Sequence, residues 1–87
     1  MNEYYMDGYR VMQIQLPDEE DTDEHPRIRL NGDGIHAGEV VLAWIPGKGL
    51  VHLRLEVSWE AVGASSWYVA NEEYRDVCPI GLWCVVS

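Results

Sequence analysis

The sequence lacks several features that would assign it to a common functional class. It has no Phe, two Cys and only six Lys or Arg against fifteen Asp or Glu, so its formal net charge is −9. No apolar run approaches the roughly eighteen residues of a membrane span, and the opening MNEYYMDGYR has neither region of a signal peptide. Two cysteines are too few for a disulfide scaffold. These absences predict a reduced, cytoplasmic protein.

The excess of negative charge excludes partners that are themselves anionic. Nucleic-acid backbones and anionic membranes attract basic surfaces, so we expect neither direct nucleic-acid binding nor membrane binding. Six of the fifteen acids lie in residues 17–26, PDEEDTDEHP, which contain no Lys or Arg. Because this stretch also has no large apolar residue, it is predicted to be a mobile, solvated acidic loop. It either docks a basic partner or only keeps the protein soluble.

The most strongly patterned stretch is residues 38–60, which predict two long strands joined by a turn at residues 46–49. The second arm alternates, and its predicted inward face is Val51, Leu53, Leu55, Val57 and Trp59. That period of two is typical of a half-buried strand. The first arm, residues 39–45, is almost continuously apolar and is predicted to be covered on both faces.

The remaining segments also predict short strands separated by turn residues. Residues 9–16 alternate with Met12, Ile14 and Leu16 inward, Asn31 to Gly34 form a turn, and residues 1–8 fray or lie against the domain. Further strands are expected at residues 27–30, 66–70 and 82–86, and a single 3₁₀ turn at the end of residues 71–79. The predicted fold class is all-β: one domain over residues 1–87, a small antiparallel barrel of five or six strands.

The nine aromatic residues divide into two groups. By strand parity the tryptophans are expected in the core: Trp44, Trp59, Trp67 and Trp83. The tyrosines are better candidates for an interface, because Tyr is enriched there and tolerates exposure. They are Tyr4, Tyr5, Tyr9, Tyr68 and Tyr74.

Motifs for metal binding and catalysis are weak. Asp21-Thr22-Asp23 supplies two alternate acidic ligands of a Ca²⁺ loop and then stops. Cys78 and Cys84 are separated by five residues, which is wider than a zinc knuckle, and Cys84 is expected to be a buried strand residue. No nucleophile elbow or Gly-rich phosphate loop is present. We therefore expect no enzyme activity, no metal and no cofactor.

From residue 38 onward the order of features resembles an SH3-like barrel. Gly38 and Glu39 open a strand, a long charged strand covers residues 50–60, a Trp-Tyr-Val strand begins at Trp67, and a turn at Pro79 precedes the closing strand. The same order is similar to a group of small bacterial domains common on mobile elements, which have no established activity. The resemblance implies an SH3-like fold. The chain lacks the Ala-x-x-Tyr opening of SH3 domains that bind Pro-rich peptides.

Taken together, the sequence predicts a non-enzymatic acidic binding protein. Its expected partner is a basic protein, such as a nucleic-acid-binding nuclease, whose basic surface it occupies as inhibitors of the anti-CRISPR type from phages and mobile elements do. The alternative is an SH3-like interaction module without an inhibitory role. The residues predicted to bind the partner are Asp18, Glu19, Glu20, Asp21, Asp23, Glu24, Glu72, Glu73, Tyr74 and Asp76.

Overall fold

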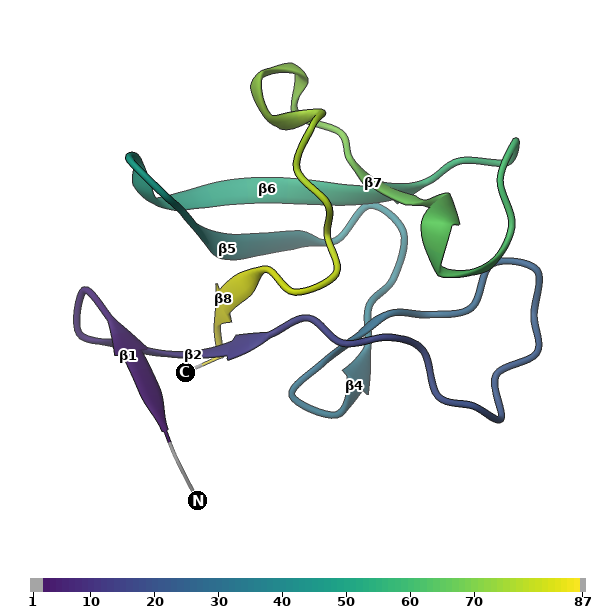
Figure 1. Ribbon diagram of the computed structural model, residues 1–87, viewed down its shortest axis with the longest axis horizontal. Helices are drawn as coiled ribbons and strands as arrows, with labels where there is room; N and C mark the ends of the chain where they lie inside the picture. Colours follow the sequence, from purple (N-terminus) through teal and green to yellow (C-terminus); the bar gives the residue numbers. More distant parts are fainter. Residues whose placement is uncertain (1–2, 87) are drawn as a thin grey trace.

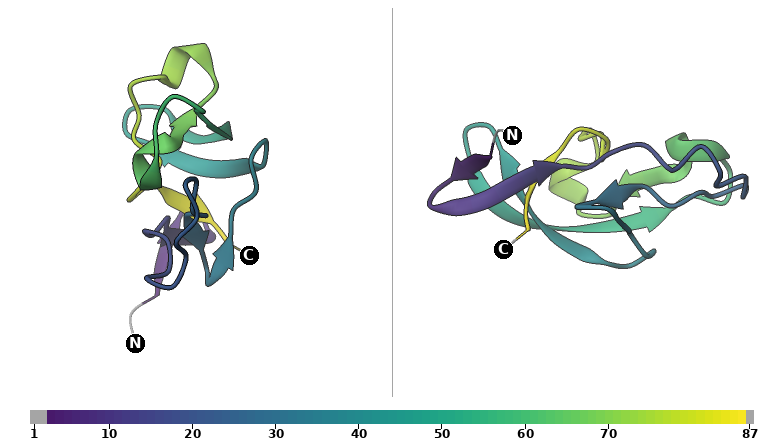
Figure 2. Two further views of the ribbon diagram at one scale, coloured as in Figure 1. Left: turned by 90° about the vertical axis from the view of Figure 1, so that its right-hand side faces the viewer. Right: turned by 90° about the horizontal axis from the view of Figure 1, so that it is seen from below.

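A computed structural model describes residues 3–86 and shows an all-β protein with two short 3₁₀ turns. The strands are β1 (Tyr4–Met6), β2 (Tyr9–Gln13), β3 (Arg29–Leu30), β4 (Asp33–Gly34), β5 (Val40–Ile45), β6 (Gly49–Val57), β7 (Trp67–Val69) and β8 (Trp83–Val85). Six of them form one antiparallel sheet in the order β1-β2-β8-β5-β6-β7, and β3 pairs with β4 in a separate hairpin (Figure 1). The molecule is flat, with extents of 36 × 33 × 16 Å (Figure 2).

The central hairpin forms as the sequence predicts. β5 pairs with β6 from Val40↔Arg54 to Ile45↔Gly49. The N–H of Lys48 donates to the carbonyl of Ile45 at 2.9 Å, and Gly47 between them has φ +83°. Pro46 and Gly47 therefore fit the two central positions of a type II turn. Leu53 and Leu55 on β6 are fully buried, as their alternation predicts.

Two expectations about this hairpin are wrong. β5 is not covered on both faces: its burial alternates along the strand, and Val40 is 54% exposed. The inward face of β6 also does not reach Trp59, which is 83% exposed. The strand ends at Val57, and the N–H of Ser58 donates to the carbonyl of Ser66 at 2.7 Å, which closes a loop. The period of two therefore no longer applies beyond that point.

The first long strand is shorter than predicted, and its buried side chains do not follow one parity. Val11 and Ile14 are buried, whereas Met12 is half-buried and Leu16 is 62% exposed. The N–H of Ile14 donates to Leu82, while Gly81, at φ +89°, donates its N–H to Ile14. Two residues, Gly81 and Leu82, thus oppose Ile14 in a G1-type bulge, which bends the strand that leads into β8.

Two hairpins have two-residue loops with positive φ. Asp7 and Gly8 join β1 to β2 at φ 51° and 84°, so residues 4–6 form a paired strand, while residues 1–2 lie outside the described range. Asn31 and Gly32 join β3 to β4 at φ 54° and 84°. Both pairs have the backbone of a type I′ turn, for which Asp-Gly and Asn-Gly are favoured. The turn predicted at Asn31 is confirmed, although Asp33 and Gly34 already belong to a strand.

The core lies between one face of the sheet and the long connection from β2 to β5. Its buried members are Ile14, Ile28, Ile35, Val41, Ala43, Ile45, Leu53, Leu55, Trp67, Val69 and Cys84. The 3₁₀ turns η1 (Gly63–Ser66) and η2 (Glu72–Tyr74) flank β7, so η2 stands earlier in residues 71–79 than expected. The pairing is that of an open sheet, and the barrel stays a prediction. None of the helical turns in residues 3–86 has the length and apolarity of a membrane-spanning helix.

Candidate partner-binding surface

Residues 17–26, called here the acidic segment, fold into a series of short turns stabilised by their own carboxylates. Asp18 Oδ1 accepts a hydrogen bond from the N–H of Glu20 at 3.2 Å. Asp21 Oδ1 accepts from the N–H of Asp23 at 3.3 Å, and Asp21 Oδ2 from that of Arg27 at 3.0 Å. Such contacts from Asp to the following backbone are a common turn chemistry. They occupy Asp18 and Asp21 and leave the other four acids to solvent.

The carboxyl-terminal end of the acidic segment is attached to the rest of the protein. The carbonyl of Pro26, which is buried, accepts a hydrogen bond from Trp67 Nε1 at 2.7 Å. The carbonyl of Glu24 accepts another from the N–H of Gly63, also at 2.7 Å. Because a buried carbonyl needs a partner, the first contact ties the segment to β7. The predicted mobility of the segment is untested, but its last residues pack against the domain.

Few cations neutralise the acidic segment. Arg29 Nη1 lies 3.5 Å from Asp18 Oδ2, a solvent-exposed ion pair of the kind that contributes at most about 1 kcal/mol. Within residues 3–86 the other two ion pairs join Arg10 to Glu3 and Arg54 to Glu56. None of the three pairs involves the four exposed acids of the segment whose carboxylates accept no hydrogen bond from the described residues. Those are Glu19, Glu20, Asp23 and Glu24.

An exposed tryptophan lies beside this charge, and the sequence analysis missed it as a site residue. The rings of Trp59 and His25 meet edge to face, with centroids 4.7 Å apart and planes at 86°. Trp59 is 83% exposed and the nearby Val62 is 65% exposed. The sequence signal for its exposure is its position at the end of the predicted strand, within Ser-Trp-Glu-Ala-Val-Gly (residues 58–63), where small and charged residues begin.

The second predicted group of binding residues lies elsewhere. Glu72, Glu73 and Asp76 are exposed on and after η2, whereas Tyr74 is half-buried and packs against the core. Figures 1 and 2 both place η2 away from the acidic segment, at the opposite side of β7. The predicted residues thus form two patches. An open groove lies beside the second patch, and its lining includes Asp76 and Leu16.

The tyrosines are exposed mainly at the β1–β2 end. Tyr4, Tyr5 and Tyr9 are 51%, 60% and 49% exposed. Tyr5 Oη donates to Glu3 Oε2 at 2.9 Å, and this hydrogen bond, together with the charge of Glu3, raises the pKa of Tyr5. Tyr4 also packs on Trp83, with centroids 4.9 Å apart. The β1–β2 hairpin, which carries these three tyrosines, lies at the end of the molecule opposite the acidic segment (Figure 1).

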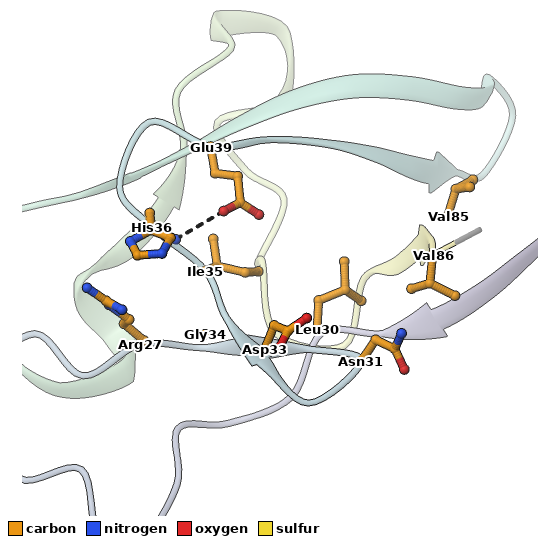
Figure 3. A pocket seen from close by; sticks show the side chains of 10 residues that line it. All are labelled: Arg27, Leu30, Asn31, Asp33, Gly34, Ile35, His36, Glu39, Val85 and Val86. Atoms are coloured by element: carbon orange, nitrogen blue, oxygen red, sulfur yellow. Dashed lines mark hydrogen bonds between the residues drawn. The ribbon is translucent and has the colours of Figure 1, made fainter.

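A hollow of about 570 Å³ lies between the β3–β4 hairpin and the end of β8 (Figure 3). It carries side chains of both charges, including Arg27, His36, Asp33 and Glu39, and the N–H of His36 donates to Glu39 Oε1 at 3.3 Å. The described side chains that line this hollow include no Ser, Thr or Cys.

The two cysteines, both in the described part of the chain, form no disulfide and lie in different environments. Cys84 is buried between β2 and β5, and burial raises the pKa of its thiol to about 12. Cys78, in contrast, is exposed. Among the described residues no group of three His, Cys, Asp or Glu is arranged to hold a metal ion.

The fold defines a small domain of antiparallel strands with an acidic segment docked against one end. Comparison with protein-family models, with curated proteins and with solved structures found no match for the chain.

Proposed function

We propose that this protein is a non-enzymatic acidic binding protein that occupies a basic surface of a partner protein. The observation that carries the proposal is the group of four exposed carboxylates on the acidic segment for which the described residues provide no ion pair. The last of them, Glu24, directly precedes His25, whose ring contacts the exposed Trp59, so this end of the segment combines charge with an aromatic residue. Charge of one sign steers association, and Trp is among the residues that contribute most to binding energy.

The partner that best fits this chemistry is a nucleic-acid-binding protein, such as a nuclease of a host defence system. A surface that binds phosphates presents Lys and Arg, and these attract a protein of net charge −9. The protein would then act as inhibitors of the anti-CRISPR type do, in the cytoplasm and without cofactor. The absence of catalytic motifs from the sequence supports a role in binding.

The experiment that tests the proposal is affinity capture from a bacterial lysate at low and high salt, with duplex DNA as competitor. The test variant replaces Asp18, Asp21 and Asp23 by Asn, and Glu19, Glu20 and Glu24 by Gln. It should capture less of a basic protein, mainly because the association rate falls as steering charge is removed. Salt and added DNA should have the same effect on the parent.

The control carries Asp7→Asn and Asp33→Asn, two exposed acids outside the acidic segment, the first in the β1–β2 turn and the second on β4. This control should capture nearly as much of the basic protein as the parent does, because it loses only two negative charges. Capture that is insensitive to salt, to DNA and to the sixfold exchange contradicts the proposal. Such a result favours the alternative, a contact through the apolar surface.

That alternative is an SH3-like interaction module without an inhibitory role. Two observations support an SH3-like arrangement: β2 pairs with β8, so the first long strand and the last lie side by side, and the 3₁₀ turn η2 precedes β8. A groove of about 510 Å³ between Leu16, Trp67 and Ile80 could accept an apolar side chain. Binding that is weakened by Leu16→Asp and not by the sixfold exchange would identify this mode.

A further inference from the structure

Trp59 is unusual because a small domain has few large apolar side chains and this one is not in the core. A buried Trp removes 150–250 Å² from water, which is a major contribution in a domain of this size. Here the indole is 83% exposed, and Val62 beside it is 65% exposed. Neither side chain contributes to the buried cluster of residues 14–84. An exposed Trp is the kind of residue that contributes most to binding another molecule.

The loop of residues 58–66, called here the Trp59 loop, is fixed by hydrogen bonds. Ser65 Oγ donates to Val62 at 2.9 Å, and Ser66 Oγ donates to Gly63 at 2.7 Å. The N–H of Ser58 donates to Ser66, and the N–H of Gly63 donates to the acidic segment at Glu24. A ring held by such a loop loses little further freedom on binding, which lowers the entropic cost of association.

The surroundings of the indole favour a cation. Glu60 follows it directly, and His25, whose ring touches it edge to face, directly follows Glu24 at the end of the acidic segment. An aromatic face next to carboxylates attracts a guanidinium, which stacks on the ring and keeps its charge near the acids. The protein already contains such a contact, because Arg75 lies over the ring of Tyr68 at 5.2 Å. Arg75, Tyr68, Trp59 and Glu60 line the same open hollow.

We infer that Trp59 binds an arginine side chain of the partner, and that the guanidinium stacks on the indole beside Glu60 and the acidic segment. The inference rests on the proposed function, because the acidic segment supplies the charge that brings a basic partner to this end of the molecule. It adds the chemical identity of the contact. A lysine would be attracted by the same carboxylates but stacks less well, since its ammonium is compact and more strongly hydrated.

The test uses two fluorescein-labelled peptides, an oligoarginine and an oligolysine of equal length, and measures binding by fluorescence anisotropy at low and high salt. The parent should bind the oligoarginine about threefold tighter than the oligolysine. Trp59→Ala should abolish this preference, leaving both peptides bound as the oligolysine is. Tyr5→Ala is the matched control, an exposed ring at the other end of the molecule, and should keep the preference.

Nuclear magnetic resonance provides an independent readout of the same contact. Of the indole N–H signals, the one that disappears in Trp59→Ala belongs to Trp59. It should shift on addition of oligoarginine. The Trp67 signal, whose N–H donates to Pro26, should shift less.

The outcomes separate the inference from the proposed function. If the parent binds the two peptides equally, or if the preference survives Trp59→Ala, the inference is wrong. The proposed function still stands in that case provided that the sixfold exchange weakens both peptides. If the sixfold exchange changes the affinity for neither peptide, the proposed function fails and the inference fails with it.

Discussion

A comparison of Leu55→Ala with Trp59→Ala tests where the alternation of buried and exposed side chains along β6 ends. Both residues fall on the inward parity of the sequence, yet Leu55 is 0% and Trp59 is 83% exposed. Truncation of a buried Leu to Ala costs about 2–5 kcal/mol, because both burial and packing are lost. An exposed surface substitution stays within about 0.5 kcal/mol. We therefore expect a large loss of stability for the first variant and almost none for the second.

The magnitudes are large enough to be measured in a domain of this size. At about 0.05–0.15 kcal/mol per residue, the whole protein has a free energy of unfolding of roughly 4–13 kcal/mol. Each kcal/mol shifts the midpoint temperature of a domain this size by about 4–8 °C. Leu55→Ala should therefore melt roughly 10–30 °C below the parent. Leu55→Val, which removes one methylene at a cost of about 1 kcal/mol, gives a smaller step if Leu55→Ala does not fold.

The assay is urea unfolding followed by far-ultraviolet circular dichroism, since removal of a Trp would confound fluorescence. A buried Trp truncated to Ala costs about 3–5 kcal/mol. If Trp59→Ala is destabilised by that amount, the indole is in the core, β6 extends beyond Val57, and the inference about arginine loses its basis. If instead Leu55→Ala unfolds like the parent, the register of the central hairpin is reversed.

Two further predictions concern buried groups. Cys78 should react with iodoacetamide much faster than Cys84 in the native protein, because Cys84 is buried and its pKa is raised to about 12, so that its thiolate is scarce at neutral pH. Mass spectrometry of the two cysteine-containing peptides measures the rates, and equal rates in the native state contradict the prediction. Trp67→Phe keeps an aromatic ring but leaves the carbonyl of Pro26 without its donor, so it should cost about 1–3 kcal/mol in urea unfolding, and a cost no greater than that of Trp59→Phe would show that this hydrogen bond does not stabilise the fold.

The elements that could be predicted from the sequence are those whose pattern is local. The β5–β6 hairpin follows from alternation on one arm and from Pro46 and Gly47 at its turn, and the bend at Asn31 follows from residues that tolerate positive φ. The burial of Cys84 follows from the period of a short closing strand. In each case residues within one element determine the outcome, and a single sequence contains that information.

The features that could not be predicted depend on contacts between residues far apart in the chain. Ile14 is opposed by both Gly81 and Leu82, a bulge that no local pattern indicates, and β2 ends at Gln13, so its alternation no longer places Leu16 inward. The acidic segment reads as an unattached loop, yet its Pro26 carbonyl bonds to Trp67, 41 residues away. Trp59 follows the parity of β6, but the strand has ended two residues earlier. The sequence therefore predicts the acidic residues of the candidate site but not its aromatic residue, Trp59.

The placement of the acids outside the acidic segment bears on how the proposed binding works. A protein that imitates a nucleic-acid backbone needs carboxylates in rows at phosphate-like spacing. Glu56 lies 3.4 Å from Arg54, and Glu39 accepts a hydrogen bond from His36, so both are engaged locally. The same outer face of β5 and β6 carries half-exposed Leu42 and Trp44 instead of a row of acids.

Charge is thus gathered in two patches, at the acidic segment and at η2, rather than along the sheet. Such a distribution favours long-range steering toward a basic surface, followed by a local contact that fixes the orientation. Because steering is screened by salt and an aromatic contact is not, the two contributions are separable in one titration. The sixfold exchange should reduce the salt dependence, and Trp59→Ala should lower affinity equally at every salt concentration. We therefore propose an acidic surface with a tryptophan anchor in preference to an imitation of the phosphate backbone.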